Sequence, residues 1–361
     1  MVATSSGGQE PSVDVASPVR AGEELDVASV DRFLKSQVPH LRGLPRVTQY
    51  AGGASNWTYR LEYENRDLIL RRPPAGTKAK SAHDMGREYR VQKALKGPYP
   101  FVPEMIAYSD DASILGAEFY VMERIAGVIV RGTRPIPLAK ETARKLCENV
   151  IDKLVELHRV DASTPELCAL GKGKGYPKRQ IEGWSLRLGK ARTFNVSRFS
   201  RVTAWLRDHT PDDVATCVVH GDFRLDNVVL DPSDLTRVIG VLDWEMATLG
   251  DPLMDLGSSL AYWVEAGDDR LMRMTRRQPT FLPGMLTRRE VVERYCGRMN
   301  LSAAHFPFYE VYGLFRLAVI AQQIYYRYYH RQTRNPAFKN YWIIVNYLAL
   351  RCEYIMRRSR L

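Results

Sequence analysis

The residues best suited to chemistry are two carboxylates and one amide that lie close together in the sequence: Asp222, Asn227 and Asp243. Short apolar runs at 228–230 and 238–242 predict the two strands of an antiparallel hairpin. Asn227 lies at the start of the first strand and Asp243 at the end of the second. The pairing of the strands should therefore bring these positions to within roughly 5 Å of each other. An oxygen atom from each side chain could then bind one Mg²⁺, because this cation takes few protein ligands and completes its shell with water and phosphate oxygens. Asp222 precedes the hairpin and could orient a hydroxyl group toward that cation.

The spacing of these residues resembles the catalytic loop and metal site of protein-kinase-like phosphotransferases. The sequence reads H-x-D-x-x-x-x-N with an Asp at the end of the next strand, and it has HGD and DW where protein kinases have HRD and DFG. These replacements are similar to the aminoglycoside phosphotransferase and choline kinase side of the superfamily. The resemblance implies that Asp222 is the catalytic base and that Asn227 and Asp243 bind magnesium. It also implies that Arg224 contacts the transferred phosphate and that His220 is a structural member of the loop.

Two alternatives to a small-molecule kinase concern the same segment. Chance is one, because Asp and Asn are common turn residues before a strand, but it requires the spacing, both apolar runs and the second Asp to coincide. A protein kinase is the other, and the absence of an activation segment between Asp243 and Asp251 disfavours it. Residues 251–256 resemble the D-P-x-x-D-L element of small-molecule kinases, in which we expect Asp255 to brace the catalytic loop by hydrogen bonds.

The length and composition are typical of a globular protein with two domains. The chain has 361 residues, and domains of roughly 150 residues are common. Hydrophobic residues make up 45% of the chain, which is enough for a buried core. The five cysteines are scattered without metal-ligand spacing, which favours reduced thiols and a cytoplasmic location. No apolar stretch reaches the length of about 18 residues that a membrane span needs, so membrane insertion is not expected.

The net charge of +11 indicates an anionic partner. Nucleic acid is one such partner, but the basic residues are spread along the chain and no nucleic-acid-binding module accompanies them. We therefore expect no nucleic-acid binding and a small anionic acceptor molecule instead. The sequence leaves the oligomeric state open.

The predicted elements give an α+β fold, with a β-rich first lobe and a larger, mostly helical second lobe. Strands are predicted at 47–50, 58–63, 68–71, 102–108 and 119–122, and helices at 84–96, at 138–158 and throughout the chain beyond the hairpin. Residues 1–24 are polar and are predicted to form a disordered tail. We expect a nucleotide-binding N-lobe at 25–122, a hinge at 123–127, and a helical C-lobe at 128–361 with the catalytic loop and acceptor site. This is the bilobal protein-kinase-like plan that the resemblance implies.

A glycine-rich segment between two predicted strands could bind nucleotide phosphates through its backbone amides. Its candidate residues are Gly52, Gly53, Ser55 and Asn56. A Gly-Gly hairpin turn explains the same residues equally well. The G-x-x-x-x-G-K-[ST] motif of P-loop ATPases occurs nowhere in the chain, which disfavours that class of enzyme.

Kinases place a Lys on the third strand and a Glu on the following helix, and this ion pair steadies the nucleotide phosphates. The corresponding candidates here are Arg71 and Glu88, with Arg72 as a rival for the first role. An Arg can bind phosphate through its planar guanidinium, although its geometry is less forgiving than that of Lys. A solvent-exposed ion pair of little consequence is the alternative. Glu123 and Ile125 of the hinge complete the expected nucleotide contacts.

Several segments resemble one branch of the family, the kinase-like domain that is fused to acyl-CoA dehydrogenases in some proteins. They include GGASN at 52–56, LRRPP at 70–74 and DWEMATLGDP at 243–252. The resemblance implies phosphorylation of hydroxylated acyl-CoA chains. Residues 161–210 contain ten Lys and Arg against four Asp and Glu, and residues 311–361 contain nine against one. So basic a lobe favours an anionic acceptor, such as a CoA thioester or an acyl acid, over cationic aminoglycosides or choline.

The sequence therefore predicts a kinase that uses ATP or GTP with Mg²⁺ and transfers the γ-phosphate to a hydroxyl group of an anionic small molecule. The residues expected to contact the acceptor are Arg179, Trp184, Arg316 and Arg327. A solvated basic surface is the alternative for each of these arginines. Two other functions remain open: an enzyme that inactivates aminoglycoside antibiotics, and a catalytically silent module that binds nucleotide or acyl-CoA.

Overall fold

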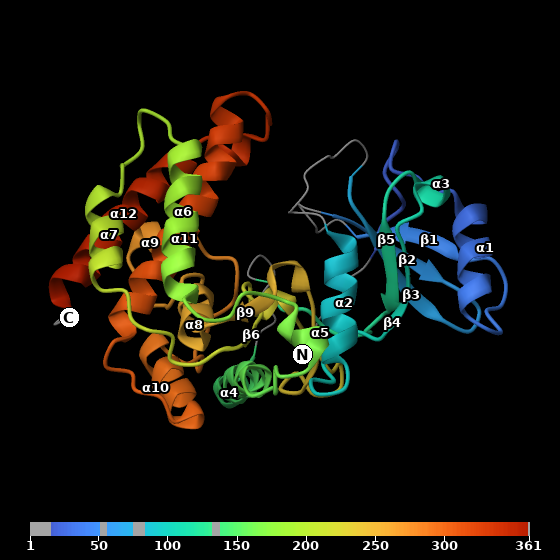
Figure 1. Ribbon diagram of the computed structural model, residues 1–361, viewed down its shortest axis with the longest axis horizontal. Coiled ribbons are helices and arrows are strands. Elements are labelled where there is room, and N and C mark those ends of the chain that lie inside the picture. The colour runs from blue at the N-terminus through green and yellow to red at the C-terminus, as the bar shows by residue number, and fades with distance from the viewer. Residues whose placement is uncertain (1–15, 51–55, 75–83, 132–137, 360–361) are drawn as a thin grey trace, which may run out of the picture. The chain divides into compact units, whose positions relative to one another are not determined.

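The chain divides into two compact units. The computed structural model describes residues 16–50, 56–74, 84–131 and 138–359. The first unit comprises Met1–Ile129 and Val228–Glu245, and the second comprises Val130–Asn227 and Met246–Leu361 (Figure 1). The hairpin that precedes Asp243 thus belongs to the first unit, whereas the sequence interpretation placed it in the helical lobe.

Backbone hydrogen bonds explain why the hairpin belongs to the first unit. The hairpin consists of two antiparallel strands, as predicted: β7 (Val228–Leu230) and β8 (Val238–Val241). The N–H of Val128 donates to the carbonyl of Leu230 at 2.9 Å, and the N–H of Val241 donates to the carbonyl of Phe101 at 2.8 Å. The hairpin is therefore bonded to segments on both sides of the predicted hinge.

The first unit is built on a five-stranded antiparallel sheet with the strand order β1-β2-β3-β5-β4. Its strands are β1 (Arg46–Gln49), β2 (Trp57–Glu62), β3 (Asp67–Arg72), β4 (Met105–Ser109) and β5 (Phe119–Glu123). Its helices are α1 (Val27–Gln37), α2 (Met85–Leu95) and the short α3 (Ala112–Leu115). Figure 1 shows α1 and α2 on opposite faces of the sheet. The five strands and α2 lie where the sequence predicts them, whereas α1 was not predicted.

Side chains of β3 alternate between the two faces of the sheet, and this alternation decides where its charged residues lie. Leu68 and Leu70 pack with α1 in one apolar core, whereas Ile69 packs with α2 in another. By the same alternation, Arg71 faces α2 and Arg72 faces the side of α1. The two neighbouring arginines are therefore not equivalent.

Residues 16–24 are part of the first unit, although they were predicted to belong to a disordered tail. Ser17 and Gln49 form an antiparallel bridge in which each backbone N–H donates to the other's carbonyl at 2.8 Å. The hydroxyl of Tyr59 donates to the carbonyl of Glu23 at 2.7 Å. The predicted tail is therefore too long, because its last residues pair with polar groups of β1 and β2. Residues 1–15 lie outside the described residues.

The second unit is mainly helical, and α11 packs against α6, α7, α8 and α12. Its helices are α4 (Lys140–His158), α5 (Pro165–Cys168), α6 (Tyr176–Lys190), α7 (Ser200–Asp208), α8 (Pro252–Leu260), α9 (Arg270–Met274), α10 (Arg288–Met299), α11 (Phe306–Tyr329) and α12 (Tyr341–Arg358). Two short strands, β6 (Cys217–Val219) and β9 (Thr248–Gly250), pair in antiparallel register. The expectation that the chain after the hairpin is entirely helical is wrong at β9, because three residues are too few to show a strand pattern.

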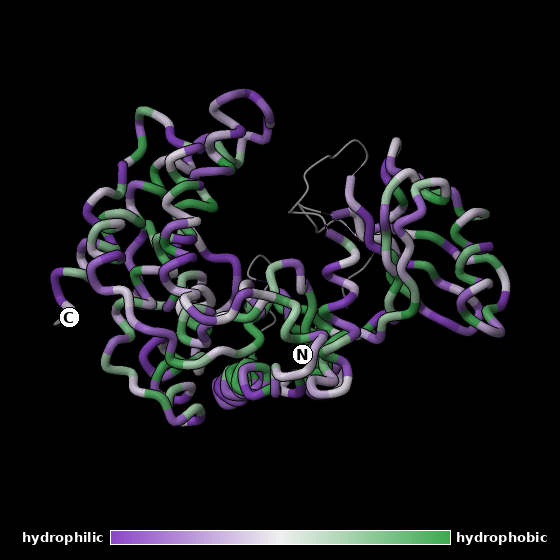
Figure 2. Tube along the Cα trace, in the orientation of Figure 1, coloured by the Kyte–Doolittle hydropathy of each residue, from purple (hydrophilic) through white to green (hydrophobic). Residues whose placement is uncertain are grey.

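Helix α4 confirms the amphipathic helix predicted at 138–158. Its apolar positions are buried as expected: Ala143, Leu146, Val150, Leu154 and Leu157. Figure 2 shows hydrophobic colour on one side of α4 and hydrophilic colour on the other. Within the described part of the chain, none of the helices combines the length and the apolar character needed to cross a lipid bilayer.

Helices α8 and α11 approach each other closely at two glycines. A Cβ atom on Gly313 would lie 2.0 Å from the carbonyl oxygen of Gly257, and a Cβ atom on Gly257 would lie 2.3 Å from the carbonyl oxygen of Tyr309. Only glycine fits at either position. This contact fixes α8, which carries Asp255, against the central helix of the unit.

Candidate active site

Gly221 sets the course of the loop at 220–227, which follows β6 and contains Asp222. Its φ of 80° lies in the left-handed region that favours glycine. A Cβ atom at this position would lie 2.8 Å from the Cβ of Met246 and 2.9 Å from the Met246 carbonyl oxygen. Any other residue would be both strained and in collision, so glycine is required immediately before Asp222.

Asp255 of α8 holds the start of the 220–227 loop. Its two carboxylate oxygens accept the backbone N–H of His220 at 2.8 Å and that of Gly221 at 2.9 Å. The Nε2 atom of His158, the last residue of α4, lies 3.1 Å from the same carboxylate, and its Nδ1 is hydrogen bonded to the hydroxyl of Tyr295. The prediction that Asp255 braces the loop is confirmed.

The charge of Asp255 is stabilised in spite of complete burial. Burial alone would raise the pKa of its carboxyl group, but the hydrogen bond from His158 and the neighbouring His220 hold this pKa below its usual value. His220 is itself buried, and its Nδ1 accepts the backbone N–H of Asp222 at 3.2 Å. These contacts give His220 the structural place in the loop that the resemblance implies.

The side chain of Asp222 is paired with Arg224 of the same loop. The Nη2 atom of Arg224 lies 3.0 Å from Oδ2 of Asp222 and 3.4 Å from Oδ2 of Asp226. The guanidinium of Arg224 also lies 4.6 Å from the centroid of the Tyr262 ring. The amide nitrogen of Asn227 donates to the backbone carbonyl of Asp222 at 2.9 Å. The loop thus brings together four of the predicted site residues, His220 included, and places Arg224 against two residues that were not predicted, Asp226 and Tyr262.

Asp243 has two features that suit a cation ligand. Its φ of 69° is uncommon for a residue other than glycine, and such conformations cluster at functional sites. Its Oδ1 is buried and has no hydrogen-bond partner among the described residues, while Nη2 of Arg71 lies 3.6 Å away. Asn227 is joined by its peptide bond to Val228, which pairs with Val241, two residues before Asp243.

The donor atoms of Asn227 and Asp243 fit Mg²⁺. Carboxylate and amide oxygens are ligands that this cation prefers. Because the amide nitrogen of Asn227 is bonded to the Asp222 carbonyl, the amide oxygen is the atom that would face a cation. No group of three or more His, Cys, Asp or Glu that could hold a metal ion occurs in the described ranges.

Arg71 and Glu88 form the ion pair that the sequence predicts. Nη1 of Arg71 donates to Oε1 of Glu88, and the two side chains are 11% and 2% exposed, so this is not the surface pair of the alternative. Burial alone would lower the pKa of Arg71, but the nearby Glu88 and Asp243 outweigh it and raise this pKa well above its usual value. Arg72 points elsewhere, with its guanidinium 5.4 Å from the centroid of the Trp57 ring.

The other predicted nucleotide contacts are only partly described. Gly52, Gly53 and Ser55 lie outside the described residues. Asn56 is buried just before β2. Glu123 is the last residue of β5 and forms an ion pair with Arg66 at 2.8 Å. Ile125 packs against the hairpin, because a Cβ atom on Gly240 would lie 2.6 Å from its Cδ1.

Two of the four predicted acceptor residues lie together beside the 220–227 loop. Arg316 is 5% exposed, its Nη2 donates to the carbonyl of Gly221 at 2.6 Å, and its guanidinium lies 5.2 Å from the centroid of the Trp184 ring. Arg316 therefore supports the loop rather than an exposed basic surface. Arg179 instead donates to the carbonyl of Gly173 at 2.6 Å, and Arg327 is exposed in the last turn of α11.

Several residues of the site were missed, and most of them left a signal in the sequence. Asp226 lies inside the recognised motif, and His158 ends a helix that was interpreted only as core. Tyr120 follows from the strand register, because it is the cross-strand partner of Arg71. Tyr262 left no such signal, since it meets Arg224 only through tertiary packing.

Sequence and structure comparisons relate the chain to known proteins. Residues 46–291 match the sequence model described as "Phosphotransferase enzyme family". The chain belongs to this family. Its likeness to a Ralstonia eutropha protein with the provisional name of aminoglycoside phosphotransferase has a TM-score of 0.80 at 25% identity, covering 94% of this chain and 100% of that chain. Choline kinase from Cryptosporidium parvum, at 10% identity, shares the fold with a TM-score of 0.62 over 92% of this chain and 96% of that chain. The predicted bilobal, kinase-like phosphotransferase fold is thus confirmed.

Longer proteins contain a region similar to this chain. Acyl-CoA dehydrogenase family member 10 from Mus musculus is 34% identical over 314 residues, covering 86% of this chain and 29% of that protein. Acyl-CoA dehydrogenase family member 11 from Homo sapiens is 34% identical over 316 residues, covering 84% of this chain and 40% of that protein. The chain spans less than half the length of these relatives. The predicted resemblance to the branch fused to acyl-CoA dehydrogenases is confirmed.

Proposed function

We propose that this phosphotransferase is a small-molecule kinase that uses ATP and Mg²⁺ to phosphorylate a hydroxyl group of an anionic acceptor. The observation that carries the proposal is the 220–227 loop, in which Asp222 lies on a braced backbone beside Arg224 and Asn227. A carboxylate base, a cationic side chain and an amide ligand are the parts that phosphoryl transfer requires.

Each residue has one task in the proposed reaction. Asp222 aligns the acceptor hydroxyl and takes its proton, while Arg224 neutralises charge on the transferred phosphate. Arg71 steadies the other phosphates of the nucleotide. Asn227 and Asp243 would hold Mg²⁺, which neutralises phosphate charge when bound. Positioning and electrostatic stabilisation then account for most of the rate enhancement.

A basic stretch in the second unit supports an anionic acceptor. No Asp or Glu occurs between residues 311 and 352. The exposed basic residues of this stretch include Arg327, Arg331, Arg334 and Lys339. An unneutralised basic surface raises the local concentration of anions and repels cationic acceptors.

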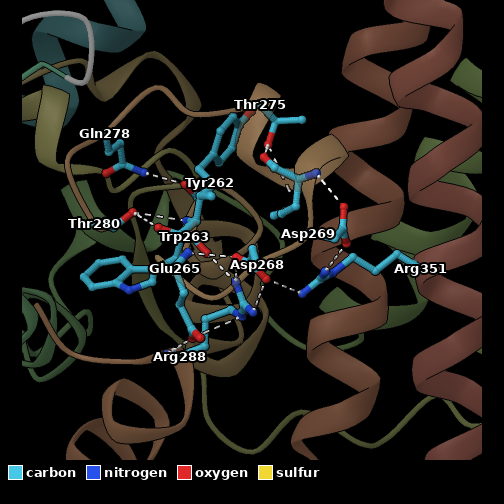
Figure 3. A network of polar contacts seen from close by, with 12 residues as sticks. Tyr262, Trp263, Glu265, Asp268, Asp269, Thr275, Gln278, Thr280, Arg288 and Arg351 are labelled. Carbon is cyan, nitrogen blue, oxygen red and sulfur yellow. Dashed lines mark hydrogen bonds and ion pairs between the residues drawn. The ribbon is translucent and has the colours of Figure 1, made fainter. Parts of the chain in front are cut away.

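Other arginines contribute less to this surface, because acidic side chains already neutralise them. Figure 3 shows Arg288 and Arg351 beside Asp268, whose carboxylate lies 2.7 Å from Nη1 of Arg288 and 3.2 Å from Nη2 of Arg351. Arg351 also lies 3.6 Å from Asp269. Arg288 and Arg351 therefore attract an anionic acceptor less than their number suggests. The basic stretch at 327–339 is the better site for an anion.

The relatives suggest which anion is the acceptor. Proteins named as acyl-CoA dehydrogenase family members contain the region that matches this chain. A kinase lobe joined to such proteins would act on a hydroxyacyl-CoA or a related acid. A CoA thioester carries phosphate groups that suit a basic surface, which makes this the preferred acceptor class.

An ADP-release assay tests the proposal. Thermal shift measurements with ATP, Mg²⁺ and CoA thioesters would first select ligands, and ADP release would then be measured with hydroxyacyl-CoAs, hydroxy acids, choline and aminoglycosides. We expect Mg²⁺-dependent ADP release with a hydroxylated acyl-CoA or acid, and a parallel series with GTP defines the donor. Nucleotide binding without ADP release for any acceptor would favour the silent module.

Inactivation of aminoglycosides is the second candidate function. It is favoured by the similarity to the Ralstonia eutropha protein, whose name carries that activity. Expression of the gene in a sensitive bacterial host separates the candidates. Raised aminoglycoside tolerance, lost in the Asp222→Asn variant, would support the antibiotic enzyme over the acyl-CoA kinase.

We also infer a cytoplasmic location. All five cysteines lie in the described part of the chain and are free thiols, four of them buried. Free thiols are typical of a reducing compartment. Detection of the tagged protein in the soluble cytoplasmic fraction would test this inference.

A further inference from the structure

Arg71 stands where the resemblance implies a Lys, and the replacement raises a geometric problem. A Lys ammonium carries three donors around one nitrogen, so it can bind a carboxylate and phosphate oxygens together. An Arg beside a carboxylate commonly forms a bidentate pair in which two nitrogens donate to the two oxygens. Such a pair with Glu88 would leave Arg71 poorly placed to bind phosphate.

The observed pair is monodentate instead. Arg71 uses Nη1 to contact Oε1 of Glu88, while its Nη2 points toward Asp243 and lies 3.6 Å from Oδ1. Oε2 of Glu88 is buried and accepts no hydrogen bond from the described residues. This is expected if the second hydrogen bond of a bidentate pair is not formed. One terminal nitrogen of Arg71 is therefore directed away from Glu88.

The hydroxyl of Tyr120 lies at the contact between the two charged groups. It donates to Oε1 of Glu88 at 2.8 Å and accepts from Nη1 of Arg71 at 3.2 Å. Both charged groups are thus bonded to the same neutral side chain. The oxygen of Glu88 that meets Arg71 is shared with a second donor, which fixes the orientation of the carboxylate.

Strand register and packing hold Tyr120 in this place. Tyr120 of β5 is the cross-strand partner of Arg71 in β3, so the two side chains share one face of the sheet. Its ring is fully buried in the core beneath α2, together with Met85 and Met122. Nε2 of Gln92 lies 3.5 Å from its hydroxyl. A ring enclosed in this way cannot move its hydroxyl away from the ion pair.

We propose that Tyr120 is a positioning residue that adapts the Arg71–Glu88 pair to nucleotide binding. Its hydroxyl keeps the pair monodentate, so that Nη2 of Arg71 is directed at phosphate oxygens. Without the hydroxyl, the guanidinium would turn to both oxygens of Glu88. The inference rests on the proposed function, because it requires that Arg71 meets the phosphates of a bound nucleotide.

A double-mutant cycle tests this role through nucleotide affinity. Dissociation constants for ATP, ADP and adenosine would be measured by calorimetry, with Mg²⁺, for the wild type, Tyr120→Phe, Arg71→Lys and the double variant. We expect Tyr120→Phe to weaken ATP and ADP binding on the order of tenfold, the scale of a hydrogen bond to a charged group, and adenosine binding by less than about twofold. In the Arg71→Lys background the same change should weaken ATP binding by less than about twofold, since an ammonium group cannot form a bidentate pair.

Tyr59→Phe is a matched control. Tyr59 is fully buried on the other face of the same sheet, and the change also removes one hydrogen bond, of 2.7 Å, to the carbonyl of Glu23. This variant should keep the ATP affinity of the wild type, and thermal melting would verify that both phenylalanine variants are folded.

Three results would count against the inference in different ways. Equal losses for ATP and adenosine, or an equal loss in the Arg71→Lys background, would show that Tyr120 is only structural. Wild-type ATP affinity in Tyr120→Phe would overturn the role of Tyr120 and leave the proposed function intact. A wild-type protein that binds no nucleotide would overturn the proposed function and the inference with it.

Discussion

The two regions that carry the proposed chemistry are held in different ways. The 220–227 loop is fixed through its backbone: Asp255 accepts two of its N–H groups, and Arg316 donates to the Gly221 carbonyl. The Arg71–Glu88 pair is fixed by side chains, with the hydroxyl of Tyr120 between the two charges. Hydrogen bonds to the backbone fix the course of the loop. Where side chains hold one another, a residue such as Arg71 can replace a Lys, provided that a neighbouring side chain adjusts its orientation.

The region held through its backbone follows the family pattern, whereas the region held through its side chains departs from it. The loop has the expected residues at the expected spacing, while the pair has an Arg in place of a Lys. We also expect the two regions to have separate roles, one in nucleotide binding and one in turnover, and mutations can test this separation. Changes at Arg71 or at the proposed magnesium ligands Asn227 and Asp243 should act on nucleotide binding, and changes at Asp222 or at the residues that brace its backbone should act on turnover.

Replacing Asp243 by Ala should have the largest effect. The change removes the only proposed carboxylate ligand of Mg²⁺, so the gain in ATP affinity that Mg²⁺ provides should disappear. Calorimetric titration of ATP with and without Mg²⁺ measures this gain. Asp234→Ala, at an exposed aspartate in the turn of the same hairpin, is the control and should keep it. A persistent Mg²⁺ effect in Asp243→Ala would remove this residue from the metal site.

Replacing Asp222 by Asn should lower turnover by about 10²–10⁴-fold, the usual scale for the loss of a general base. The ATP dissociation constant should change by less than about twofold, because the proposed role of Asp222 is with the acceptor. ADP-release rates and calorimetry measure the two quantities separately. An unchanged rate would exclude Asp222 as the base, and a large loss of ATP affinity would break the division between the two regions.

Local patterns predicted much of the fold and of the 220–227 loop. The hairpin, the five strands of the first sheet, α2 and α4 were found because their apolar residues repeat at strand or helix spacing. Asp255 was predicted to brace the loop because a short motif carries it. The limits of the first unit were less predictable, since residues 16–24 and the hairpin join it through hydrogen bonds between distant segments.

The predicted acceptor residues show what sequence reasoning cannot resolve. Arg316 was predicted to contact the acceptor because it is basic and lies in a basic segment. In the structure it is buried and bonded to Gly221, a contact between residues 95 positions apart. Tyr120 and Arg71 are likewise separated by 49 positions. Charge composition cannot distinguish an arginine beneath a loop from one at the surface, because only tertiary packing decides this.

Replacing Asp255 by Asn should reduce both stability and turnover while ATP binding persists. The amide nitrogen cannot accept the N–H that one carboxylate oxygen now binds, and one buried donor is left unpaired. We expect the free energy of unfolding to fall by about 2–3 kcal/mol. Urea unfolding and ADP release measure the effects. Asp152→Asn weakens a partly exposed pair with Arg294 in the same unit, and as a control it should leave turnover unchanged.

Asp251 and Asp255 both belong to α8 or its N-cap, yet their surroundings shift their pKa values in opposite directions. Burial raises the pKa of Asp251 from 3.8 to about 6, although its carboxylate accepts the N–H groups of Val214, Leu253 and Met254. The pKa of Asp255 is lowered from 3.8 by His158 in spite of burial. The backbone donors around Asp251 therefore do not replace the imidazole that faces Asp255.

The smallest expected effect is a pH dependence of stability that comes from Asp251. Between pH 3.8 and about 6 the folded protein binds a proton at Asp251 that the unfolded chain releases, so this contribution to stability falls as the pH rises through that window. Asp251→Asn keeps an oxygen acceptor for the helix N-terminus but cannot ionise. Relative to the wild type, the free energy of unfolding of this variant should rise by about 1–2 kcal/mol between pH 4.5 and pH 7, measured by urea unfolding at several pH values.

Asp255 acts in the opposite sense, because its contribution to stability is present above pH 3.8 and is lost only as the pH falls below that value. A stability difference between Asp251→Asn and wild type that stays constant with pH would mean that the backbone N–H groups fully offset the effect of burial, so that the Asp251 pKa is the same in the folded and unfolded protein.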